Sequence, residues 1–248
     1  MNIIDVNKEN LEQEHICCAI SSNKDIQVKS KKAWLAEQFD QGLVFKKGDV
    51  RGKCFIEYLP AEKAWVPIEA DHYMYIDCFW VSGQFKGKGY SNQLLKACLE
   101  DCKSKGKKGV VILSSQDKKK PFLCDYDYLA YKGFKVVDHV DPYFDLMCYT
   151  FEEEKILPKF KLGKNDVEKG FVLYYTHQCP FTAKYGPIIE QYAKEESIPF
   201  KMIPLTTREA AQKAPTPFTT YSLFYNNTFI TNEILNINKF KKIIEELL

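Results

Sequence analysis

The first group of residues that could do chemistry is a short loop with two glycines. The segment 84–89, QFKGKG, follows an apolar run and leads directly into a helical pattern. Gly87 and Gly89 can adopt backbone conformations closed to other residues, and the first N–H groups of the helix point at the same spot. Such a cradle can hold a pyrophosphate, with Lys86 and Lys88 adding positive charge. An ordinary strand–turn–helix connection is the alternative, since neither GxGxxG nor GxxxxGK[ST] is present.

The second group is a carboxylate within an apolar strand. Asp77 lies in the run 73–81, YMYIDCFWV, where alternation places it on the face of Phe79 and Val81. A carboxylate next to a reacting amine can act as a general base. A strand aspartate held by neighbouring hydrogen bonds is the alternative interpretation.

The third group surrounds Cys179. This cysteine stands before Pro180 between a strand and a helix candidate, and Thr216-Pro217 opens a later strand. The arrangement resembles the thioredoxin/glutaredoxin fold, which implies a lowered cysteine pKa at the helix start and a cis bond before the later proline. Thr182 occupies the position of the second cysteine, so intramolecular dithiol exchange is excluded. Cys179 could form mixed disulfides, bind a thiol compound, or have no redox role.

The elements that must position these groups fall into two sets, and the first precedes residue 155. It contains strands predicted at 2–6, 52–59, 73–81, 109–113 and 134–140, and helices at 30–41, 90–105 and 122–131. Ser30 is a possible N-cap of the first helix, and Gly42 lies just past its end.

The second set restarts the pattern after a charged segment. It contains strands predicted at 171–176, 199–204, 217–224 and 227–230, and helices at 181–195, 207–213 and 238–247, the last with Asn238 as a possible N-cap. We therefore predict an α/β (α+β) chain with one domain at 1–154, a linker at 155–170 containing a short extended piece, and a small second domain at 171–248.

The first domain resembles the GNAT N-acetyltransferases. The segment 81–89, VSGQFKGKG, matches their Q/R-x-x-G-x-G/A acetyl-CoA motif, and the strand GVVIL and the later segment 131–134, YKGF, follow in the family's order. The resemblance implies a mixed sheet with two splayed parallel strands and acetyl-CoA as the acetyl donor. Backbone groups at 79–81 would contact pantetheine, and N–H groups from 85 to 91 would hold the pyrophosphate. The implied cofactor-binding residues are Phe79, Trp80, Val81, Gln84, Phe85, Lys86, Gly87, Lys88, Gly89, Tyr90 and Ser91.

The same resemblance assigns catalytic roles. It implies direct acetyl transfer to an amine, with Asp77 as the base candidate and His72 and Glu69 as weaker candidates acting through a water. The family's usual tyrosine acid is replaced by Leu129, so Tyr128 and Tyr131 are the candidates for protonating the leaving thiolate. Cys179 is kept as a fourth catalytic candidate.

The whole chain resembles acetyltransferases that carry a C-terminal YoaP-type, thioredoxin-like domain, which leaves the acceptor open as a small-molecule or protein amine. Acidic and aromatic groups in the segment 56–70 could begin an acceptor cleft for a cationic amine, or could pack in a β-hairpin. These groups are Glu57, Tyr58, Glu62, Trp65 and Glu69. A thiol-handling or binding protein whose GNAT-like half senses CoA is the alternative function.

Composition narrows the class of protein. Lys and Arg number 35 and Asp and Glu 33, and this balance argues against a nucleic-acid binder that relies on a broad basic field. The nine cysteines are odd in number, without a CxxC pair, which argues against a secreted disulfide scaffold. No apolar run approaches the ~20 residues of a membrane span. We expect a cytoplasmic protein with mostly reduced cysteines.

Overall fold

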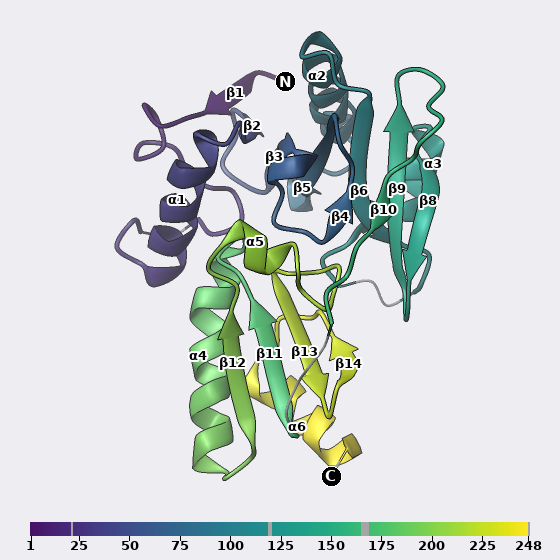
Figure 1. The fold of residues 1–248 in the computed structure, drawn as a ribbon. Helices are drawn as coiled ribbons and strands as arrows, with labels where there is room; N and C mark the ends of the chain where they lie inside the picture. The colour runs from purple at the N-terminus through teal and green to yellow at the C-terminus, as the bar shows by residue number, and fades with distance from the viewer. Residues whose placement is uncertain (21, 119–120, 165–168, 248) are drawn as a thin grey trace.

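The chain folds into two sheet-based units that lie one above the other, with the N-terminus in the first and the C-terminus at the far end of the second (Figure 1). The computed structural model describes residues 1–20, 22–118, 121–164 and 169–247. Part of the predicted linker, 165–168, lies outside these residues. Within the described part of the chain, no helix is both long and apolar enough to cross a membrane.

The first unit is built on one mixed sheet. Its strands are β1 (Ile3–Val6), β2 (Val44–Gly48), β3 (Cys54–Pro60), β5 (Tyr73–Val81), β6 (Gly109–Ser115), β9 (Phe144–Thr150) and β8 (Lys135–Val140), in that spatial order, and β7 (Cys124–Asp125) pairs with β6. Only the β5–β6 and β6–β7 pairs in this sheet are parallel. Helix α1 (Ile26–Phe39) covers one face, and α2 (Tyr90–Ser104) and α3 (Tyr126–Tyr131) cover the other.

The two parallel central strands separate halfway along their length. β5 and β6 pair from Tyr73 to Ile76 and from Gly109 to Ile112, and no pairing continues beyond Ile76, although β5 runs on to Val81. The predicted splay is therefore present. It opens the sheet beside the carboxyl end of β5, where the glycine loop follows.

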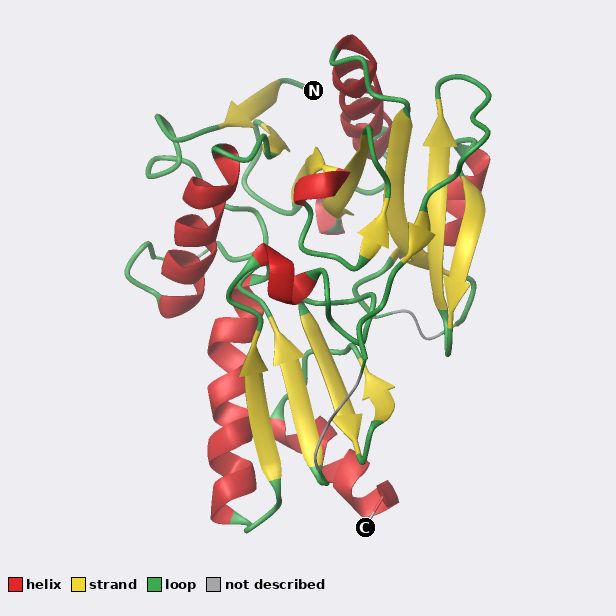
Figure 2. Cartoon of the chain, in the orientation of Figure 1, coloured by secondary structure: helices red, strands yellow, loops and turns green. Residues whose placement is uncertain are grey.

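The second unit is a four-stranded sheet in the order β12-β11-β13-β14 (Figure 2). Its elements are β11 (Phe171–Tyr175), α4 (Pro180–Glu195), β12 (Phe200–Pro204), α5 (Arg208–Ala211), β13 (Tyr221–Tyr225), β14 (Thr228–Thr231) and α6 (Ile237–Leu247). β11 and β12 are parallel, and β13 and β14 are antiparallel to their neighbours. The predicted order of elements in this unit is confirmed, and the predicted extended piece of the linker is β10 (Lys159–Phe160), which pairs with β4 (Ile68–Glu69).

Several predicted elements require correction. β2, β4, β7 and β9 were absent from the predicted order. Helix α1 begins at Ile26, so Ser30 lies inside it and not at its N-cap. The side chain of Asn236 accepts the N–H of Lys239 at 3.0 Å and starts the last helix, in place of Asn238. The bond before Pro217 is trans, whereas the thioredoxin resemblance implied a cis bond.

One hydrophobic cluster spans the two units, in addition to a separate cluster within each unit. A single cluster of buried residues contains Phe45, Phe55 and Leu59 of the first unit together with Val172 and Phe224 of the second. Such a continuous core means that each unit buries apolar surface of the other.

Polar bonds reinforce the junction. Asn232, fully buried, accepts from the hydroxyl of Tyr143 at 2.7 Å and donates to the carbonyl of Pro121 at 2.7 Å. Gln212 donates to the carbonyl of Ala64 at 3.0 Å. Because these bonds link backbone and buried side chains, they fix how the second unit sits on the first.

Candidate active site

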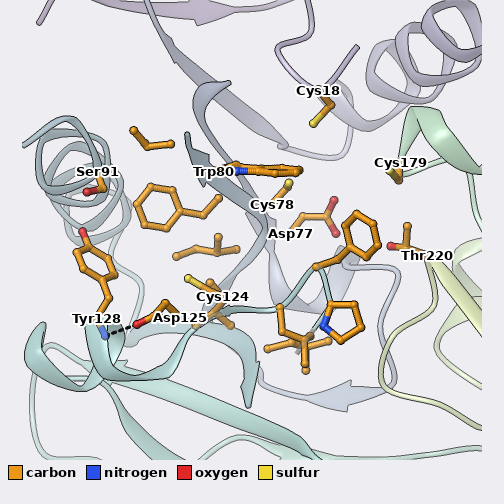
Figure 3. Close-up of a pocket in the computed structure, with 18 of the residues that line it drawn as sticks. Cys18, Asp77, Cys78, Trp80, Ser91, Cys124, Asp125, Tyr128, Cys179 and Thr220 are labelled. Atoms are coloured by element: carbon orange, nitrogen blue, oxygen red, sulfur yellow. Dashed lines mark hydrogen bonds between the residues drawn. The ribbon is translucent and has the colours of Figure 1, made fainter. Parts of the chain in front are cut away.

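A cavity of about 650 Å³ lies at the opening between β5 and β6 and is walled by both units. Its first-unit wall comes from β5, β6, the glycine loop and the start of α3, and its second-unit wall comes from the start of α4 and the segment before β13 (Figure 3). Four of the nine cysteines line it, namely Cys18, Cys78, Cys124 and Cys179. The cavity thus gathers most of the candidate residues in one place.

The glycine loop has the open backbone geometry that the predicted cradle requires. Gly87 and Gly89 both have φ of +73°, and a Cβ atom added at either would meet no atom within 4 Å. Gly89 is the N-cap of α2, so the unbonded N–H groups of the first helical turn face the same space. The open space, the left-handed glycines and the helix start together fit the pyrophosphate of acetyl-CoA.

The amide groups of the loop are not all available to a ligand. The N–H of Phe85 donates to the carbonyl of Ser82 at 3.3 Å, and that of Lys86 donates to Gly83 at 3.2 Å. The predicted set of N–H donors, residues 85 to 91, therefore loses its first two members, Phe85 and Lys86. The donors that the loop can offer begin at Gly87.

Most predicted cofactor-binding residues line the cavity. They are Phe79, Trp80, Val81, Phe85, Lys86, Gly87, Gly89, Tyr90 and Ser91. Gln84 and Lys88 are exposed and do not line it, because the short 3₁₀ turn Gly83–Phe85 buries Phe85 and turns Gln84 outward. Tyr131 also lies outside, with 82% of its surface exposed at the last residue of α3.

A β-bulge changes the orientation of Asp77. Glu57 pairs with Cys78 and Tyr58 with Ile76, so Asp77 is the extra residue between two paired positions. The extra residue breaks the alternation. Cys78 then packs against the α1 side and Phe79 against the α2 side. The prediction that Asp77 shares a face with Phe79 and Val81 is therefore wrong.

Asp77 instead meets a buried ion pair on the α1 side. Lys31 of α1 and Glu57 of β3 form a salt bridge of 2.6 Å, with side chains 2% and 1% exposed. Burial, followed by the negative charge of Glu57, raises the pKa of Asp77 well above its ordinary value, although Lys31 opposes the shift. Asp77 still lines the cavity, so this carboxyl can reach a ligand.

Tyr128 lies on the opposite side of the cavity from Asp77 (Figure 3). Asp125 caps α3 by accepting the N–H of Tyr128 at 2.9 Å, and the Tyr128 hydroxyl donates to Asn92 at 3.2 Å. Burial raises the pKa of Tyr128, which keeps the phenol protonated and able to donate. Leu129 is fully buried, and its hydrocarbon side chain has no proton to donate.

Cys179 lines the cavity at the start of α4, and its burial disfavours the thiolate form. Burial raises the pKa of Cys179 to about 12, with a backbone hydrogen bond from Phe181 opposing the shift. The lowered pKa that the thioredoxin resemblance implied is therefore wrong, because desolvation outweighs the helix start. The finding argues against thiolate chemistry at Cys179 and favours its role as part of a wall.

We expect Cys179 to react slowly with iodoacetamide. An ordinary thiol has a pKa near ~8.5, so a group with a pKa of about 12 holds about 10³-fold less thiolate at neutral pH. The measurement is the rate of carbamidomethylation at each cysteine, followed by peptide mass spectrometry, with unfolded protein as the reference. Alkylation of Cys179 at the unfolded rate would contradict this assignment.

The sequence interpretation missed the second-unit wall of the cavity. Gln178, Phe181, Phe218, Thr220, Glu233 and Ile234 all line it. No pattern along the chain shows which residues meet when two units dock, although the position of Cys179 at a helix start was a partial signal.

The segment 56–70 does not line the cavity. Tyr58 donates to Asp101 at 2.8 Å and Trp65 donates to Gln38 at 3.1 Å, both from buried positions. Glu69 pairs with Lys159 and Lys161, at 3.0 and 2.6 Å, and so is not placed to act as a base. His72 also lies outside the lining residues. Packing therefore explains most of this segment, and only Glu57 acts near the site.

Comparison with known proteins agrees with both units. Residues 8–122 match the acetyltransferase (GNAT) family, and residues 199–242 match the YoaP-like family. Over 251 aligned residues, covering all of both chains, the protein is 41% identical to a Bacillus subtilis (strain 168) protein called uncharacterized N-acetyltransferase YoaP.

Solved structures similar to this chain include two acetyltransferases. A GNAT family acetyltransferase from Brucella melitensis, in complex with acetyl-CoA, is 13% identical, with 63% of this chain and 91% of that chain covered and a TM-score of 0.39. The PaiA N-acetyltransferase from Thermoplasma acidophilum, in complex with coenzyme A, is 15% identical, with 61% and 100% covered and a TM-score of 0.41.

The full-length relative and the GNAT match establish the family. The chain therefore belongs to the GNAT N-acetyltransferases that carry a YoaP-like domain, and it transfers an acetyl group from acetyl-CoA to an amine.

Proposed function

We propose that the acceptor is a small-molecule amine that binds between the two units. The observation that carries this proposal is the composition of the cavity walls, since the second unit supplies Cys179, Phe181 and Thr220 on the side away from the glycine loop. A cavity of this size, walled by both units, suits a small molecule better than a protein side chain approaching from outside. A cytoplasmic location, where donor and acceptor would meet, is part of the proposal.

Each of the three parts of the chain predicted from the sequence has its own role in this function. Residues 1–154 bind acetyl-CoA, 155–170 connect, and 171–248 form the acceptor wall. The donor's pyrophosphate would bind the N–H groups from Gly87 to Ser91, and its pantetheine would follow residues 79–81 of β5 on the edge that β6 leaves unpaired. The support is that these backbone segments line the cavity where β5 leaves β6.

The catalytic roles follow from position. Asp77 accepts the proton of the amine, and Tyr128 donates a proton to the thiolate of CoA. The support is that both groups line the cavity on opposite sides, with a phenol that stays protonated. Tyr131 is left out of the proposal because it is exposed.

Consumption of acetyl-CoA in the presence of a panel of small amines tests this function. Thioester absorbance is the proper signal, because the nine thiols of the chain would consume a thiol reagent. We expect turnover with one class of small amine and none with lysine-containing peptides. Turnover of peptides at equal or higher rates would contradict the proposed acceptor.

Tyr128→Phe is expected to lower kcat by about 10²-fold or more, because loss of a general acid has an effect of that size. The KM for acetyl-CoA should stay unchanged, since the ring and its contact with Phe79, at 6.0 Å between centroids, are retained. Steady-state kinetics measures both constants. Tyr131→Phe is the control and should behave as the wild type; equal losses in both variants would contradict the assignment.

A further inference from the structure

Three side chains from three elements meet beneath the cavity on the α1 side. Lys31 and Glu57 form a salt bridge of 2.6 Å and are almost completely buried, and Asp77 lies beside them in the bulge of β5. The ammonium group of Lys31 also lies 4.2 Å from the centroid of the Trp34 ring. Burial lowers the pKa of Lys31, but the carboxyl groups of Glu57 and Asp77 more than offset this, so Lys31 remains charged.

The charges in this group do not balance if both carboxyls are ionised. One lysine would then face two carboxylates in a buried place, which costs far more than one buried ion pair. The hydrogen bonds indicate how the balance is reached. Oε1 of Glu57 accepts from Lys31, while Oε2 is buried and has no donor among the described residues. The Asp77 carboxyl lies within hydrogen-bond reach of Glu57, so a proton on Asp77 supplies the missing donor.

We propose that Lys31 and Glu57 are positioning residues for acetyl transfer, which hold Asp77 at the cavity wall as one half of a carboxyl pair that carries a single proton. The proposal rests on the proposed function, in which Asp77 receives the proton of the acceptor amine. Asp77 is the catalytic residue, because it alone of the three lines the cavity.

The proton transfer balances as follows. The amine nitrogen forms a bond to the carbonyl carbon of the thioester, and the carbon–sulfur bond breaks. One proton leaves the nitrogen for the free oxygen of Asp77, while the proton that Asp77 already carries passes to Oε2 of Glu57. Tyr128 protonates the leaving thiolate. The pair then returns one proton to solvent, and Tyr128 recovers one from solvent, so the products are the amide and the free thiol.

Four other titratable groups on the elements packed around Asp77 have pKa values that keep them neutral near pH 7, namely Tyr75, Cys78, His177 and Cys179. On β5 itself, burial raises the pKa of Tyr75, and a hydrogen bond with Cys18 followed by burial raises that of Cys78. From α4, Cys179 has a pKa of about 12. From the turn before α4, His177 has a pKa lowered by burial and bonds to Ser30 of α1 at 2.8 Å between Oγ and Nδ1. From the N-terminal segment, the Cys18 thiol also faces the cavity.

Infrared spectroscopy tests the shared proton without any acceptor. At neutral pH the wild type should show the carbonyl stretch of a protonated carboxyl group, which ionised carboxylates lack. Asp77→Asn should remove it while keeping the fold, because an amide can donate to Glu57 as the carboxylic acid does. Glu57→Gln should also remove it, because Asp77 then ionises beside Lys31. A wild type without the band, or an unchanged band in Asp77→Asn, would overturn the proposal.

The pH profile of kcat/KM tests the positioning roles, using the amine that the panel identifies. Lys31→Met should move the acidic limb to higher pH by about one unit or more, because the pair loses its cation. Glu57→Gln should move the same limb to lower pH, because Asp77 loses its anionic neighbour. Where a single variant does not fold, the double variant Lys31→Met/Glu57→Gln removes both members of the ion pair and so leaves neither charge buried alone. Its acidic limb should lie between those expected for the two single variants. Asp77→Asn should lower kcat by at least about 10²-fold at every pH.

Matched controls separate the possible failures. Lys47→Met removes another buried lysine, which pairs with Glu14 at 2.5 Å and does not line the cavity, and should leave the limb unmoved. His177→Asn should also leave it unmoved. Two results would overturn the proposal. One is an equal loss of activity at all pH values in the Lys31 and Glu57 variants, and the other is a shift of the acidic limb in the same direction in both. A wild type that turns over no small amine would instead overturn the proposed acceptor, while the infrared result still decides the state of the pair.

Discussion

Replacing Gly87 and Gly89 together by valine is expected to weaken acetyl-CoA binding by about 10²-fold or more while the protein stays folded. Both residues have φ of +73°, a conformation that costs a side-chain-bearing residue roughly 1–2 kcal/mol and a β-branched residue more. We expect the variant loop to relieve this strain by changing conformation. Binding of acetyl-CoA then requires the original conformation, so the strain energy is subtracted from the binding free energy. The strain at two residues, together with valine methyl groups that occupy the space of the ligand, should lower the affinity for acetyl-CoA by about 10²-fold or more.

Isothermal titration with acetyl-CoA measures this loss, and thermal unfolding measures the fold. Gly106→Val is the matched control, because Gly106 has φ of +66° and the same open surroundings, but follows α2 away from the cavity. It should lose stability to a similar degree and keep its affinity for acetyl-CoA. Unchanged binding in the double variant would contradict the assignment of the cradle.

Removing residues 161–248 is expected to unfold the remaining chain, not to release a free acetyltransferase domain. Phe144, buried in the full chain, packs edge-on against Phe229 at 5.3 Å between centroids, and the shared core also includes Val172, Leu205 and Phe224. Each large apolar side chain left exposed forfeits about 1.5–3 kcal/mol. The sum of several such losses approaches the net stability of a folded protein, which is usually roughly 5–15 kcal/mol.

Calorimetry distinguishes the two outcomes. The full chain should unfold in a single transition, and the shortened chain should show none. Asn232→Ala serves as a milder control, since it removes only the bonds to Tyr143 and Pro121 and should cost about 1–3 kcal/mol without changing the number of transitions. A shortened chain that melts cooperatively and binds acetyl-CoA would contradict the shared core.

The sequence predicted the parts of the site that depend on local pattern. The strand Tyr73–Val81 and the start of α2 at Tyr90 were predicted at their observed bounds, because a nearly unbroken apolar run indicates the strand and a repeat of leucine and cysteine indicates the helix. The strand Val44–Gly48 was missed because two of its five residues are lysines. Lys47 is buried there only because Glu14 pairs with it.

The parts that depend on pairing and docking could not be predicted. The bulge at Asp77 arises from the register between β3 and β5, and a single unpaired residue there moves the carboxyl to the α1 side. The pKa of Cys179 follows its burial in the folded chain, where it packs against the core of the second unit, and the local motif does not contain that burial. Lys31 lies far from the glycine loop in the sequence, and only the packing of α1 brings it to Glu57.

The most direct measurement for this account is a crystal structure of the full chain with acetyl-CoA. We expect the pyrophosphate against the N–H groups from Gly87 to Ser91, and the acetyl group in the cavity between Asp77 and Tyr128, with its methyl side toward the second unit at Cys179 and Phe181. An acetyl group that lies outside this cavity, or a second unit that does not face it, would contradict the claim that both units build one active site.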